Sequence, residues 1–291
     1  MEMAQELLKI SQSDLGSAEI LYSKGHYGQA VFSFQQSVEK LSKSFGLFAG
    51  IIKENELKGR SGIGHEGTKI FEKHYSNVEK DYQIIYEKVM NSPNPPNKSV
   101  MKAMGILQAI NQAKRISKKL EKFRNDSIGL VFVPAKEIRE VFEEVDKEYG
   151  KILGRPFVKT EFNEYVKTVS GVLDSLEYLN PSKVQEEKAK LIAMDMKEFE
   201  TKYYAKIKMN IAKFLRLYLT LFFLNIIVLP HSSLSRYPEL EVQHSPSKVY
   251  TKKLPLVKSL PYLIERQREA ILEYKSLIKI ANKNNKEVKT S

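Results

Sequence analysis

Residues 25–45 read GHYGQAVFSFQQSVEKLSKSF, and the apolar side chains within this stretch follow a regular spacing. They recur at alternating intervals of four and three residues, at Tyr27, Val31, Phe34, Val38, Leu41 and Phe45, with Phe48 next in phase. This spacing places one apolar stripe along one side of an α-helix. The stretch therefore predicts a long helix that buries this stripe in a helical core.

Helical spacing of apolar residues continues through the rest of the first half of the chain. A similar stripe ends at NSPNPPN, residues 91–97, where three prolines prevent a helix from continuing, so a third helix should end near Met90. Further helices are expected at residues 3–23, 100–123 and 136–152. No segment alternates like a β-strand. The sequence predicts an all-α fold, an up-and-down bundle over residues 1–152.

The second half is expected to form another helical domain, residues 157–291, after a hinge at Gly154-Arg155-Pro156. A helix over 162–176 should stop at Asn180-Pro181-Ser182, and a long charged helix should then run towards Leu229. Residues 230–255 lack helical periodicity and are expected to be a long loop. A last helix is expected over 260–282, with Ser259 as its cap, Pro261 in its first turn and a frayed tail beyond it.

Composition narrows the function classes. The chain has 291 residues, 42% of them hydrophobic, and no cysteine, so disulfides, thiol catalysis and cysteine-ligated metals are excluded. The first 20 residues contain no apolar signal segment, and a cytoplasmic location is the default expectation. The apolar run Phe214–Leu229 is 16 residues long and includes Arg216, which favours a core helix over a membrane anchor, and no membrane partner is expected.

The net charge of +12 is unevenly distributed. Residues 1–150 carry 22 Lys and Arg against 20 Asp and Glu, whereas residues 151–291 carry 25 against 15. A basic surface favours polyanionic partners such as nucleotides, nucleic acids or acidic lipids.

The motifs for a P-loop, a dinucleotide fold, a zinc protease or a nucleophile elbow are all absent, so we expect no cofactor and no metal.

A polar band accompanies the apolar stripe of the second helix. Gln36, Glu39, Lys40 and Lys43 are three, one and three residues apart, which places them on one side of the helix. A solvated face with internal ion pairs would account for them. However, the segment resembles the second helix of HEPN domains, in which Q-x-x-E-K-x-x-K follows a small turn and an aromatic residue.

IGHEGTKIF, residues 63–71, is similar to the start of the third helix in that family, with His65 as the corresponding histidine. The resemblance covers residues 1–145, and a further RYP segment at Arg236-Tyr237-Pro238 is similar to one in some HEPN proteins but lies outside that range. It implies a bundle of four or five helices and, often, a homodimer. It also implies two functions: RNases of toxin-antitoxin or phage-defence systems, in some cases beside a nucleotidyltransferase, and non-catalytic relatives that bind nucleotides or nucleic acid.

The catalytic signature of these RNases is an arginine and a histidine separated by four to six residues. Arginine binds phosphate, and a neutral histidine can accept the proton of the 2′-hydroxyl. Arg124 and Asn125 match the usual position, but the histidine is missing because residues 129–131 are Gly, Leu and Val. Arg60 and His65 have the right spacing elsewhere, in a glycine-rich turn. Catalysis, packing at a helix start and phosphate binding all remain open for this pair.

The predicted fourth helix has a cationic arc that includes Lys114 and Lys118. Arg124 falls in phase with the apolar face of that helix, so it needs an anionic partner, either Glu39 or a bound phosphate. The first hypothesis is a non-catalytic protein that binds nucleotide or RNA through Arg124, Asn125, Lys114, Lys118 and the Gln36–Lys43 band. The alternatives are a metal-independent endoribonuclease that uses Arg60 and His65, and a helical dimerisation scaffold.

Overall fold

The computed structural model describes residues 2–57, 63–91, 106–125, 131–160, 162–163, 166–167, 170, 181–193, 195–231, 235 and 245–290. Every regular element within these ranges is a helix, which confirms the all-α prediction. The chain forms two compact units, one made of residues 1–142 and 217–291 and the other of residues 143–216. The hinge expected at residues 154–156 lies inside the second unit, and the C-terminal helix, expected in a second domain over 157–291, belongs to the first unit.

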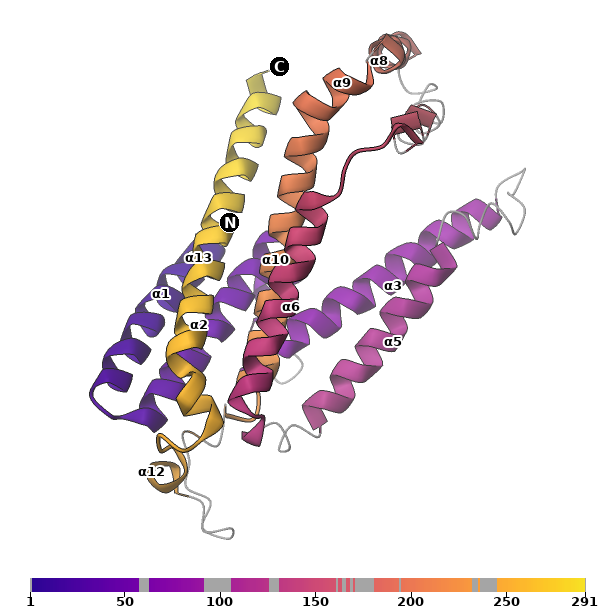
Figure 1. Cartoon of the computed structure of the whole chain (residues 1–291). Helices are drawn as coiled ribbons and strands as arrows, with labels where there is room; N and C mark the ends of the chain where they lie inside the picture. Colours follow the sequence, from indigo (N-terminus) through magenta and orange to yellow (C-terminus); the bar gives the residue numbers. More distant parts are fainter. Residues whose placement is uncertain are drawn as a thin grey trace. The chain divides into compact units, whose positions relative to one another are not determined.

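The first unit begins with the predicted helices. These are α1 (Glu2–Ser23), α2 (Tyr27–Phe48), α3 (Thr68–Met90), α5 (Ile106–Asn125) and the first part of α6 (Ala135–Gly154), with the short turn η1 (Glu54–Glu56) between α2 and α3. Helix α1 packs along α2, and α3 lies beside α5 (Figure 1). The bounds of α1 and α6 agree with the sequence-based expectations to within two residues, and α3 ends at Met90 just before the proline-rich segment. The start expected at residue 100 for the fourth helix lies outside the described residues, and α5 is described from Ile106.

The core of the first unit is built on the apolar stripe of α2. Phe34, Leu41 and Phe45 are fully buried, together with Phe71 of α3 and Tyr274 near the other end of the chain. The ring of Tyr274 packs edge-on against Phe45, and its hydroxyl group donates a 2.9 Å hydrogen bond to the Ser44 carbonyl oxygen. Burial of such large side chains is the main stabilising contribution to a helical bundle of this kind.

Tyr274 belongs to α13 (Pro255–Thr290), which is longer at both ends than the sequence indicates. Ser259 is buried inside the helix rather than at its cap, and Pro261 lies within the helix rather than in its first turn. The helix can begin earlier because Pro255 occupies its first position, where a missing N–H costs nothing. The short helix α12 (Pro246–Val249) precedes it, inside the segment expected to be a loop.

The apolar run beginning at Phe214 lies in α10 (Ala205–Val228). This is the single helix among the described residues that is long and apolar enough to cross a membrane by length and composition. Leu217, Leu221 and Leu224 on it are fully buried in the first unit, as expected of a core helix.

The second unit contains the rest of α6, then α8 (Pro181–Ala193), α9 (Met196–Phe199), the π-helical segment η3 (Glu200–Tyr204) and the first part of α10. The long charged helix expected after Pro181 is therefore interrupted. Asp195 caps α9 by accepting a 2.7 Å hydrogen bond from the Glu198 N–H, which begins a new helix at that point. Arg216 and Asp146 form an ion pair at 2.9 Å within this unit.

Candidate functional site

The polar band of α2 is buried in the structure. Glu39 is 1% exposed and Lys43 is 7% exposed, while Gln36 and Lys40 are half-buried. A solvated face therefore does not describe this side of the helix. A charged group is buried only when partners compensate the cost of removing it from water, so the contacts of Glu39 determine what this cluster can do.

Glu39 is surrounded by cations and amides. Its Oε1 lies 2.6 Å from the ammonium of Lys43 and 3.4 Å from that of Lys40. Its Oε2 lies 3.3 Å from Nδ1 of His65 and accepts hydrogen bonds from the side-chain amides of Gln35 and Gln36, at 3.3 Å and 3.4 Å. The α2 cluster, meaning Gln35, Gln36, Glu39, Lys40, Lys43 and His65, is thus a connected network of ion pairs and hydrogen bonds.

The electrostatics of the cluster follow from this geometry. Burial raises the pKa of the Glu39 carboxyl, but the charges of Lys43 and Lys40, a hydrogen bond from Lys43 and the charge of His65 oppose it, and the net pKa is lower than usual. Asp14 of α1 feels the same charges. Burial raises its pKa, Lys40 lowers it and Glu39 raises it further. Glu39 is therefore an anion near neutral pH whose charge is met within the protein.

The backbone of the loop that carries His65 contacts α2 at Gly64 and α10 at Gly67. Gly64 adopts a positive φ of 55°, which favours glycine, and its carbonyl oxygen accepts a hydrogen bond from Lys43. Gly67 approaches Asn225 so closely that a Cβ atom would lie 1.8 Å from the amide oxygen. Asn225 in turn donates 2.6 Å and 2.7 Å hydrogen bonds to the Ser42 hydroxyl and the Leu221 carbonyl oxygen.

His65 occupies the boundary between the cluster and solvent. Its side chain is 66% exposed although its Nδ1 contacts the buried Glu39 carboxylate. Its other ring nitrogen, Nε2, makes no hydrogen bond with the residues that the structure describes. A carboxylate that orients one nitrogen of an exposed imidazole leaves the second nitrogen available to exchange a proton with a bound molecule.

The other predicted site residues fall into a second group on α5. Lys114 and Lys118 are exposed, as are Arg115, Lys119 and Lys122 on the same helix. We call these five residues the α5 cationic face. None of them forms an ion pair with a residue in the described ranges. Their charges are therefore available to an external anion, in contrast to the lysines of the α2 cluster.

The remaining predicted residues are described to different extents. Arg60 lies outside the described residues. Arg124 lies in α5, but its side chain is outside the described set, and the adjacent Asn125 is exposed. The anionic partner proposed for Arg124, Glu39, already contacts Lys43, Lys40 and His65.

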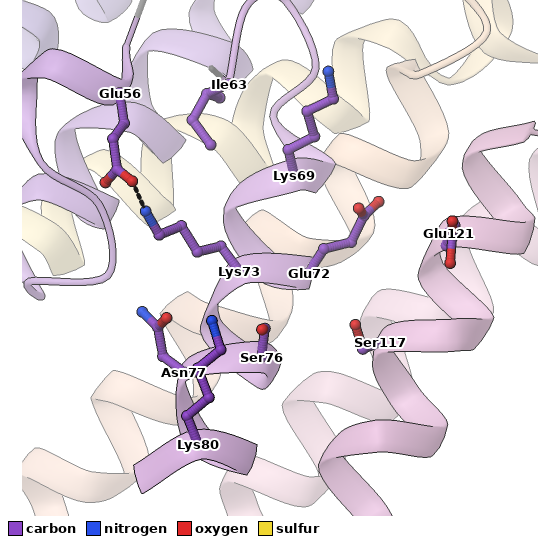
Figure 2. A pocket seen from close by; sticks show the side chains of 10 residues that line it. All are labelled: Glu56, Ile63, Lys69, Glu72, Lys73, Ser76, Asn77, Lys80, Ser117 and Glu121. Atoms are coloured by element: carbon purple, nitrogen blue, oxygen red, sulfur yellow. Dashed lines mark hydrogen bonds and ion pairs between the residues drawn. The ribbon is translucent and has the colours of Figure 1, made fainter. Parts of the chain in front are cut away.

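A polar cleft of about 430 Å³ lies between α3, α5 and η1 (Figure 2). Its lining includes Lys69, Lys73 and Lys80, balanced by Glu56, Glu72 and Glu121, and Lys73 forms an ion pair with Glu56. Ser76 on α3 and Ser117 on α5 lie on opposite sides of the cleft (Figure 2). Ile63, two residues before His65, also lines it, so the cleft adjoins the His65 loop.

Sequence reasoning missed two contributors to this region. Gln35 is one turn before Glu39, and the i, i+4 spacing on a helix was a signal that could have identified it. Asn225 is 183 residues from its partner Ser42, and no local pattern indicates such a contact.

Comparison with known proteins agrees with the helical architecture. A family model described as the HEPN domain matches residues 4–177, more than half of the chain. No curated protein and no solved structure gives a significant match. The matched range contains the α2 cluster, the His65 loop and the α5 cationic face. This chain therefore belongs to the HEPN domain family.

Proposed function

We propose that this HEPN protein binds RNA or a nucleotide through the α5 cationic face and the adjoining cleft, without cleaving it. The observation that carries the proposal is the set of five exposed cations on α5 that make no ion pair within the described ranges. Clustered positive charge of this kind attracts phosphate groups and releases counterions when it binds them.

The cleft supports a specific orientation of such a ligand. Among its described lining residues, the formal charges of three lysines and three glutamates cancel, so these residues do not form an anion site by charge alone. It does offer hydroxyl and amide groups, at Ser76, Asn77 and Ser117, which can form hydrogen bonds with a base or a sugar. Phosphates on the α5 cationic face and a base or sugar in the cleft are therefore compatible.

The α2 cluster was expected to bind the nucleotide or RNA directly, but its lysines are already engaged within the protein. Lys43 already contacts Glu39 and the Gly64 carbonyl oxygen, so it is not available to a phosphate without breaking a buried ion pair. Lys40 donates a 2.8 Å hydrogen bond to Gln36 and is also close to Glu39. The cluster is better suited to positioning the His65 loop than to binding phosphate itself.

A gel-shift titration of single-stranded RNA tests the binding proposal. The Lys114→Gln/Lys118→Gln variant should bind more weakly, and the slope of log affinity against log salt should fall by roughly 1.4, because two phosphate contacts are lost. The matched control is Lys9→Gln/Lys24→Gln, which removes the same charge from exposed positions on and just after α1. Equal loss of affinity in both variants would show that only net charge matters, and would contradict a site on α5.

A second candidate is a metal-independent endoribonuclease, and the contact between Glu39 and His65 favours it. In this mechanism Glu39 would orient His65, whose Nε2 would accept the proton of the 2′-hydroxyl as its oxygen attacks the adjacent phosphate. The bond from that phosphorus to the 5′-oxygen of the next nucleotide would break, and the departing oxygen would take up a proton from solvent. Arg60 would bind the phosphate by analogy with the family signature. This reading requires chemistry at His65, whereas the first requires only binding.

Incubation of end-labelled RNA with the purified chain in excess EDTA separates the two readings. Retention of intact RNA supports the binding protein. Cleavage that His65→Ala abolishes and His26→Ala retains would establish the endoribonuclease instead, since His26 is an exposed histidine outside the α2 cluster. Cleavage that persists in His65→Ala would exclude His65 as the base.

The family resemblance also suggests a cytoplasmic homodimer that serves in a toxin-antitoxin or phage-defence system, with a nucleotidyltransferase as a partner. Light scattering of the purified chain tests the dimer. Co-purification with a nucleotidyltransferase encoded beside it tests the partner, and a monomer that captures no such enzyme would contradict both.

A further inference from the structure

A second pocket, of about 320 Å³, lies in the first unit apart from the α2 cluster and the cleft. Its walls are almost entirely apolar. Phe222, Phe223, Ile226 and Ile227 of α10 form one side, and Ile138 and Val141 of α6 contribute to the other. At about 30 Å³ per water-sized group, the volume holds roughly ten non-hydrogen atoms. This combination of size and lining is typical of a small-molecule site.

Two titratable groups line the pocket. His231 is 1% exposed, and its Nδ1 shares a 2.7 Å hydrogen bond with the Tyr250 hydroxyl. Burial lowers the pKa of His231 to about 3, so its ring carries no charge near neutral pH. Glu137 is exposed and forms no ion pair with the described residues, whereas its neighbour Lys136 pairs with Glu140 at 3.5 Å. Among the described residues of the lining, the single formal charge is therefore the Glu137 carboxylate.

This charge distribution selects among the ligands that fit. An anion would enter an apolar pocket with no cation among the described lining residues to compensate its desolvation, and it would approach a carboxylate. A neutral hydrocarbon would fill the volume but would gain no interaction with the exposed Glu137 carboxylate. A molecule with an apolar body and one ammonium group matches both the apolar walls and the Glu137 carboxylate.

We propose that this pocket binds a compact apolar primary amine, with its hydrocarbon body against α10 and its ammonium group at the Glu137 carboxylate. The whole chain carries a net charge of +12, which would favour an anionic ligand over a cationic one. A preference for the amine must therefore come from the local charge of Glu137. The inference rests on residues that the proposed RNA site does not use, and it stands or falls separately.

The test compares three probes of one shape, 4-phenylbutan-1-amine, 4-phenylbutan-1-ol and 4-phenylbutanoate, by calorimetric titration of the full chain. The amine should bind most tightly, the alcohol about threefold more weakly, as expected for loss of one partly exposed ion pair, and the acid weakest. Absence of saturable amine binding, or equal binding of the acid and the amine, would overturn the proposal without any variant.

Two variants locate the site. Glu137→Gln should reduce affinity for the amine to that for the alcohol. Glu143→Gln, six residues further along α6 and outside the lining, should leave the order of the three probes unchanged. The chain has no tryptophan, so Phe223→Trp introduces a single fluorescent reporter in the pocket wall, and its emission should change as the amine binds. An unchanged amine preference in Glu137→Gln would remove the assignment of the ammonium position.

Discussion

The Oε2 atom of Glu39 lies 3.3 Å from the Nδ1 atom of His65, although the two residues are 26 positions apart and differ widely in exposure. Glu39 is held inside the bundle by α2, and His65 is held at the surface by a loop whose backbone binds Lys43. A buried carboxylate and an exposed imidazole are thereby linked. Stability and any chemistry at His65 should depend on the same contacts.

Removal of the Glu39 charge should destabilise the fold. Glu39→Gln leaves the ammonium of Lys43 buried without its carboxylate, and loss of one partner from a buried ion pair costs about 3 kcal/mol. Urea denaturation measures the change in the free energy of unfolding. Glu6→Gln is the matched control, because Glu6 pairs with Lys9 on an exposed face, and its loss should cost under about 1 kcal/mol. Equal effects would contradict the burial of the α2 cluster.

Acid should weaken the same network. The pKa of Glu39 is lowered in the folded state from its ordinary 4.5, so its ionised form stabilises the protein above that pH. As the pH falls from 4.5 through the lower folded-state value, the folded protein must take up a proton that the unfolded chain already holds, and the stabilisation is lost. Urea midpoints should therefore fall more steeply with acidity in the natural chain than in Glu39→Gln. Parallel curves would refute this.

His231 should add a separate pH dependence. Burial lowers its pKa from 6.5 to about 3, so between these values the unfolded chain binds a proton at His231 that the folded protein does not. Stability should therefore decrease as the pH falls below 6.5, by about 2 kcal/mol between pH 7 and pH 5. His231→Gln should remove this decrease even if it lowers stability overall, whereas the exposed His26→Gln should retain it. Thermal unfolding at the two pH values measures the difference.

The approach of Gly67 to Asn225 predicts a steric effect. In Gly67→Ala the new methyl group would overlap the Asn225 amide, which is fixed by hydrogen bonds to Ser42 and Leu221, and overpacking of this kind costs about 1 to 3 kcal/mol. Gly16→Ala is the control, since nothing lies within 4 Å of its Cβ position in α1. That variant should gain about 0.5 to 1 kcal/mol from helix propensity. A tolerated Gly67→Ala would indicate that the His65 loop can move away from α10.

Local sequence patterns predicted the helices well, because a helix is defined by the spacing of apolar residues and by breaking residues within a short stretch of chain. The stripe from Tyr27 to Phe45 and the prolines after Asn91 were enough to define α2 and the end of α3. The start of α13 was less predictable, because Pro255 is compatible with a loop or with a first helical position, and burial of Leu256 and Val257 selects the helix.

The sequence on its own determined that the protein is all-helical, that it lacks cysteine chemistry, and that α5 carries a cationic face, because these follow from composition and from a repeat of 3.6 residues. Only the tertiary structure decided that the polar band of α2 is buried, that His65 reaches Glu39, and that Tyr274 packs against Phe45. The last two contacts join residues 26 and 229 positions apart, and the packing of whole helices selects them. No local spacing encodes which helix lies beside which.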